Sequence, residues 1–71
     1  SVFQFVYYAE TNSELTLELL DVTGKSVYTA IYHVYTGENM IRVNPGQISP
    51  GLYLLQVNDG QRRSSGKLII E

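Results

Sequence analysis

The side chains that could perform chemistry are few, and they do not form a catalytic pattern. The chain holds one histidine, His33, and no cysteine, so neither a thiolate metal site nor a cluster of histidine ligands can form. A general base needs an orienting partner and a nucleophile within hydrogen-bond reach, and the sequence nominates neither for His33. We therefore interpret His33 as a structural or surface residue and expect no catalytic residue and no metal.

The closest pair of carboxylates within one element is Glu18 and Asp21. Residues three apart in a β-strand point to opposite faces, so this pair cannot act on one substrate unless the strand is bulged. The glycines occur singly in turns, and a formal net charge of -2 is unsuited to binding nucleic acid. The sequence thus predicts no enzyme activity, no cofactor, no small-molecule substrate and no nucleic-acid partner.

Tyrosines offer a possible binding surface. Tyr28 and Tyr32 fall on the same side of one predicted strand, about 13 Å apart at the usual rise, and Tyr8 or Tyr35 could extend that face. Sugar-binding modules use flat aromatic surfaces of this kind. The alternative, which we favour, is that these rings cover the core, because tyrosine is common inside β-sandwiches.

Apolar residues recur with a period of two along the chain, which indicates β-strands. The predicted strands cover residues 2–8, 15–22, 26–35, 40–43, 52–57 and 64–70, with a break at 36–39 and a hairpin turn at 58–60. In the second run, Leu20 and Val22 change sides relative to Leu15, Leu17 and Leu19. This change fits either a bulge or a strand end covered on both faces.

Six to seven short strands with no room for crossover helices predict an all-β, antiparallel Ig-like β-sandwich. A chain of 71 residues is too short for two cores, so we expect a single domain over residues 1–71. The segment Ile48–Tyr53 has the character of a corner at which a sandwich chain passes between sheets. Tyr53 is expected to bury its ring there and to return its hydroxyl to the backbone upstream.

Four segments add a more specific pattern, in a fixed order along the chain: DVTGK at 21–25, NMIRV at 39–43, ISPGLYLLQV at 48–57 and GKLII at 66–70. Together they resemble the type A C-terminal sorting domain of type IX secretion cargo in Bacteroidetes, over residues 15–71. The resemblance assigns three groups of residues to recognition: Asp21 and Gly24 in a turn motif, Pro50, Gly51 and Tyr53 at the corner, and Lys67, Leu68, Ile69 and Ile70 in a terminal signal.

The resemblance implies a non-catalytic signal that directs a parent protein through the periplasm and outer membrane to the cell surface or exterior. Its implied partners are the outer-membrane translocon and sortase components of the type IX system and a cargo domain N-terminal to it. Because the chain opens on Ser1 within a strand pattern, we expect a longer parent protein whose C-terminus lies at or near Glu71.

Structure alone would explain several of these positions. Gly24 and Gly51 suit turns, and Leu68 and Ile70 suit a core face, whereas Lys67 is not required by the fold. The alternative function is an Ig-like accessory or carbohydrate-binding module of a secreted hydrolase, and a structural spacer comes third. The carbohydrate-binding alternative needs an exposed tyrosine platform.

Overall fold

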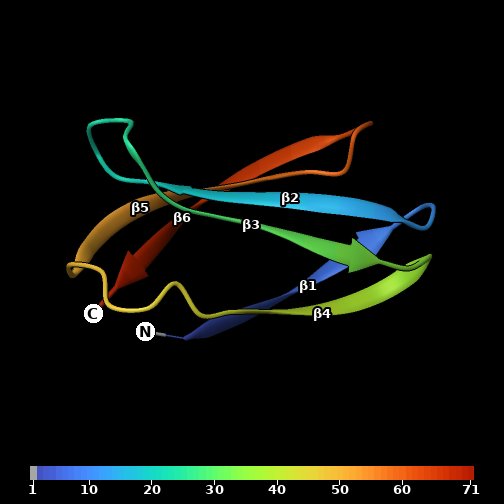
Figure 1. The fold of residues 1–71 in the computed structure, drawn as a ribbon, viewed down its shortest axis with the longest axis horizontal. Coiled ribbons are helices and arrows are strands. Elements are labelled where there is room, and N and C mark those ends of the chain that lie inside the picture. The colour runs from blue at the N-terminus through green and yellow to red at the C-terminus, as the bar shows by residue number, and fades with distance from the viewer. Residues whose placement is uncertain (1) are drawn as a thin grey trace.

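The computed structural model describes residues 2–71, and these residues form β-strands joined by turns, without a helix that could cross a membrane. The strands are β1 (Phe3–Ala9), β2 (Ser13–Leu20), β3 (Ser26–Val34), β4 (Gly37–Val43), β5 (Gly51–Asn58) and β6 (Arg63–Ile70). β1 pairs with β4, and the other four form a sheet in the order β3-β2-β5-β6, with every pairing antiparallel. The two sheets lie face to face (Figure 1), which confirms the predicted all-β, Ig-like sandwich.

The core lies between the sheets and follows the alternation read from the sequence. Leu15, Leu17 and Leu19 of β2 are completely buried. Ile41 and Val43 of β4, in the smaller sheet, pack in one cluster with Leu15 and Leu17. A fully buried aliphatic side chain stabilises the folded state by roughly 1.5–3 kcal/mol. Because no disulfide is available, this burial carries the stability of the domain.

A β-bulge lies beside Leu20 in the pairing of β2 with β3, but its extra residue is on β3 and not on β2. The register shifts between Leu19 and Leu20, since Leu19 pairs with Tyr28 and Leu20 with Ser26, so Val27 is the extra residue of a β-bulge. Leu20 points outward, as the alternation along β2 requires after the buried Leu19. Val22, two residues later, is strongly exposed. The bulge therefore does not bring Leu20 and Val22 into the core, and these apolar residues lie on the outer face of the sheet.

The predicted break at 36–39 was wrong for most of its length. Gly37, Glu38 and Asn39 belong to β4, because they pair with Ala9, Tyr8 and Tyr7 of β1. These residues are polar or glycine, so they give no apolar alternation by which a strand could be predicted. They are extended because their backbone groups pair with β1, and this pairing does not depend on the side chains.

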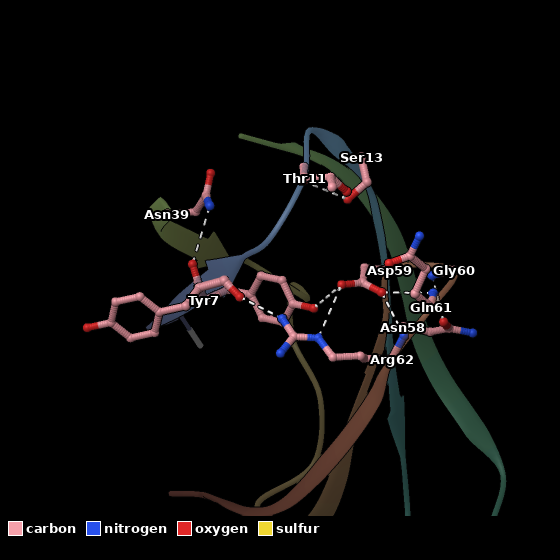
Figure 2. Close-up of polar contacts among 10 residues, drawn as sticks. Tyr7, Thr11, Ser13, Asn39, Asn58, Asp59, Gly60, Gln61 and Arg62 are labelled. Carbon is pink, nitrogen blue, oxygen red and sulfur yellow. Dashed lines mark hydrogen bonds and ion pairs between the residues drawn. The ribbon is translucent and has the colours of Figure 1, made fainter. Parts of the chain in front are cut away.

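A polar contact ties the smaller sheet to the β5–β6 hairpin (Figure 2). The Tyr7 hydroxyl of β1 donates to Asp59 Oδ2 at 2.7 Å, and Arg62 Nη2 donates to the Tyr8 carbonyl at 2.9 Å. Asp59 Oδ1 also accepts the backbone N–H groups of Gln61 and Arg62. The hydrogen bond from Tyr7, followed by those from the hairpin backbone, lowers the pKa of Asp59 from 3.8 to about 2.

This depressed pKa predicts an acid-sensitive contribution to stability. The contribution is present above about pH 4, where Asp59 is ionised in both folded and unfolded states, and it is lost as the pH falls toward about 2. We expect Asp59→Asn to lose less unfolding free energy than the wild type over that interval, as measured by urea denaturation at each pH. Tyr7→Phe should reduce the acid loss in the same direction because it removes the main donor. Parallel curves for all three proteins would contradict this account.

Candidate functional site

The residues first considered for chemistry lie apart in the structure. His33 is an exposed residue of β3 and pairs in register with Glu14 of β2. Glu18 lies in mid-strand on the outer face of the larger sheet, whereas Asp21 lies in the turn after β2. Within residues 2–71, no group of three or more histidine, aspartate or glutamate side chains is placed to hold a metal ion. Glu18 and Asp21 thus belong to different elements, a strand and a turn.

The tyrosines do not form a platform. Tyr28 and Tyr32 are partly buried and pack against the core cluster that contains Leu15 and Leu17, as the favoured interpretation predicted. Tyr8 and Tyr35 are exposed, but both occupy positions whose side chains point away from the core, whereas the rings of Tyr28 and Tyr32 point toward it. The surface that a carbohydrate-binding module needs is therefore not assembled from these residues.

Asp21 organises the β2–β3 turn. Its Oδ1 accepts the Thr23 hydroxyl at 2.6 Å, the Thr23 N–H at 2.9 Å and the Lys25 N–H at 3.1 Å. The hydrogen bond from the Thr23 hydroxyl is the main reason that the pKa of Asp21 is lowered. Gly24 adopts a φ of 88°, a conformation that costs other residues steric strain, and its N–H donates to the Asp21 carbonyl. The turn thus holds a fixed shape while its side chains remain outside the core.

The corner before β5 has the predicted form. The Tyr53 ring is 7% exposed and packs with Leu19 and Ile70, and its hydroxyl donates to the Ser49 carbonyl. Ile48 packs against the same cluster from the loop. Tyr53 therefore joins the loop, β5 and the terminal strand in one packed unit.

The predicted terminal signal is divided by the pleat of β6. Leu68 and Ile70 point inward and pack in the cluster around Tyr53. Lys67 and Ile69 point outward, and Ile69 is 70% exposed. Only the second pair is available to another molecule.

The Asp21 turn, the corner and the end of β6 meet at one end of the molecule (Figure 1). A groove of about 450 Å³ there contains Asp21, Gly24, Tyr53 and Lys67 in its lining, with Leu20 and Leu54 among the other lining residues. Pro50 and Gly51 line an adjacent groove that also includes Asp21 and Tyr53. The structure thus brings together six of the nine predicted residues, although they come from three separate segments.

Sequence reasoning missed the most exposed part of this region. Val22 is 78% exposed and Leu52 is 45% exposed, and both line the groove beside Lys67. Leu52 pairs directly with Ile69 across β5 and β6. We call Val22, Leu52 and Ile69 the apolar patch. Its signal in the sequence was the appearance of apolar residues at outward positions of these strands.

Comparison with known families gives one match that covers nearly the whole chain. The model of the secretion system C-terminal sorting domain matches residues 3–71. No curated protein and no solved structure matches the chain.

The packing around Tyr53 predicts a large stability effect. Tyr53→Ala should lower the unfolding free energy by about 3–5 kcal/mol because it removes a buried ring. Tyr53→Phe should cost about 0.5–1.5 kcal/mol, since only the hydroxyl bond to Ser49 is lost. Thermal and urea denaturation measure both, with the exposed Tyr35→Ala as the matched control. A cooperative transition of Tyr53→Ala near that of the wild type would refute the role of the corner.

Proposed function

Because the chain belongs to the family of type IX secretion C-terminal sorting domains, we propose that its apolar patch and Lys67 form the surface that the export machinery recognises. Sorting domains of this family are non-catalytic and mark proteins for export through the periplasm and outer membrane to the cell surface or exterior. They act with the type IX machinery on a parent cargo N-terminal to them. We propose further that the components that bind the domain are the outer-membrane translocon and the sortase.

The observation that carries the proposal is that exposed apolar residues gather beside one groove of the larger sheet. Val22, Leu52 and Ile69 are apolar although their side chains are exposed to solvent, where the packing of the fold does not require an apolar residue. Apolar residues clustered on a surface and bordered by polar groups are typical of protein-binding sites. Here the border is formed by Asp21 and Lys67, which line the same groove.

The other predicted residues then have supporting roles. Gly24 and the Asp21 carboxylate fix the turn that presents Val22, while Pro50 and Gly51 lead the chain into the strand that presents Leu52. Tyr53, Leu68 and Ile70 anchor the inner faces of the same strands. We infer that the domain has no catalytic site of its own and is a substrate of the machinery that reads it.

Two exposed isoleucines on the outer face of the larger sheet provide a matched test. Ile69 is 70% exposed within the apolar patch, and Ile31 is 64% exposed on β3. We expect Ile69→Asn to reduce surface export of a periplasmic reporter fused to residues 1–71 by about tenfold, since an isoleucine buried on binding contributes at least about 1.5 kcal/mol. Ile31→Asn should be exported normally.

The measurement is the fraction of reporter at the surface of a type IX-competent bacterium, with the periplasmic fraction counted separately. Both variants should retain the melting temperature of the wild type, because neither isoleucine lies in the core. Equal export of the two variants would show that the apolar patch is not the recognised surface.

A further inference from the structure

The two open sheets leave four edge strands, and these edges are not equivalent. β3 and β4 close against each other, since the Tyr32 hydroxyl of β3 donates to the Arg42 carbonyl of β4 at 3.2 Å. The edge of β1 is covered at one end by Arg62, which donates to the Tyr8 carbonyl. No side chain of residues 2–71 forms a hydrogen bond with the backbone of β6 or of β3, the two edge strands of the larger sheet. β6 is therefore an open edge of that sheet, and of its two edge strands it is the one that contains arginine and lysine.

The register shows which backbone groups of β6 point away from β5. The Asp59 N–H donates to the Arg62 carbonyl at 3.1 Å, so these residues form a hydrogen-bonded pair at the hairpin end. Pairing continues without a shift from Asn58 with Arg63 to Gly51 with Ile70. Because bonded and non-bonded pairs alternate in antiparallel strands, the outward N–H and C=O groups belong to the odd-numbered residues of β6. These are Arg63, Ser65, Lys67 and Ile69.

The same residues give this edge a charge opposite to that of the rest of the domain. β6 contains Arg63 and Lys67 and no acidic residue, although the whole chain has a formal net charge of -2. Neither Arg63 nor Lys67 forms an ion pair within residues 2–71. An extended segment that carries carboxylates would therefore meet complementary charge along the edge as well as unpaired backbone groups.

We propose that β6 binds its partner by strand addition, and that the partner is an extended acidic segment of the secretion machinery. This inference rests on the proposed function and adds how the contact is made: the partner's backbone bonds to the β6 edge, and its carboxylates face Arg63 and Lys67. Ile69 takes part in both the apolar patch and the open edge of β6. Its side chain belongs to the apolar patch, and its backbone N–H and C=O groups point away from β5.

A second copy of this chain is a poorer occupant. Two β6 strands paired antiparallel about Ser65 would place Arg63 of each copy opposite Lys67 of the other. Like charges directly opposite each other in a sheet are destabilising. The charge of the strand thus favours a different, acidic partner over self-association through this edge.

Ser65→Pro tests the backbone contact without changing the apolar patch or any charge. Proline has no N–H, and the N–H at this position faces the open edge, so the pairing of β5 with β6 keeps its hydrogen bonds. We expect the reporter fusion to keep a cooperative thermal transition while its surface fraction falls about tenfold, the effect of removing one or more hydrogen bonds and adding a steric block. Normal export of folded Ser65→Pro would overturn strand addition while leaving the Ile69 result free to support the proposed function.

The charge is tested separately, which keeps the inference falsifiable if Ser65→Pro does not fold. Arg63→Glu should lower surface export about tenfold, whereas Arg42→Glu, an equal change of charge at an exposed arginine of β4, should not. Equal export of the two variants would overturn the acidic partner. Analytical ultracentrifugation of the domain gives the remaining outcome: a dimer that Ser65→Pro dissociates would place a second copy on β6 and refute the proposal.

Discussion

The burial of Tyr53 is the interaction on which the arrangement of this domain's binding end depends. Its ring packs against Leu19 from β2 and Ile70 from β6, and its hydroxyl reaches back to Ser49 in the loop. One side chain thus fixes the positions of two neighbouring strands and of the corner between the sheets. The groove that contains Asp21 and Lys67 exists because those strands are held together beneath it.

The pleat of β6 gives its last residues two roles. Leu68 and Ile70 face inward and belong to the Tyr53 cluster, so substitutions there act first on stability. Lys67 and Ile69 face outward, and substitutions there act on recognition in our proposal. Removing the whole segment would combine both effects, whereas single substitutions on alternate residues separate them. This distinction allows a sorting signal to be studied in a folded domain.

The sequence was sufficient to predict local structure and much of the candidate site. Alternation predicted all six strands, and the residues around Pro50 and Gly51 predicted the corner and the upstream bond of Tyr53. It could not show the contact of Tyr7 with Asp59, because these residues are 52 positions apart and the strand and hairpin patterns that contain them carry only local information. The N-terminal part of β4 was missed for a related reason, since its strand character comes from pairing with β1.

Sequence reasoning nominated only Ile69 of the apolar patch, because the members of the patch come from three segments. Val22 follows β2, Leu52 is the second residue of β5 and Ile69 is the last but one of β6. Only the sheet order β2-β5-β6 places them together. Asp21, Gly24 and Lys67 were nominated by family resemblance, and the structure supplies the physical reason that they can act with one another. Their assignment to recognition is a proposal about this surface.

The central claim is that this end of the larger sheet contacts the export machinery directly. Site-specific photocrosslinking tests it, with a benzophenone side chain placed at residue 69 or residue 31 of an exported reporter fusion. We predict a crosslink from residue 69 to an outer-membrane component of the type IX system and none from residue 31. Equal crosslinking from both positions, or export without any crosslink from residue 69, would contradict it.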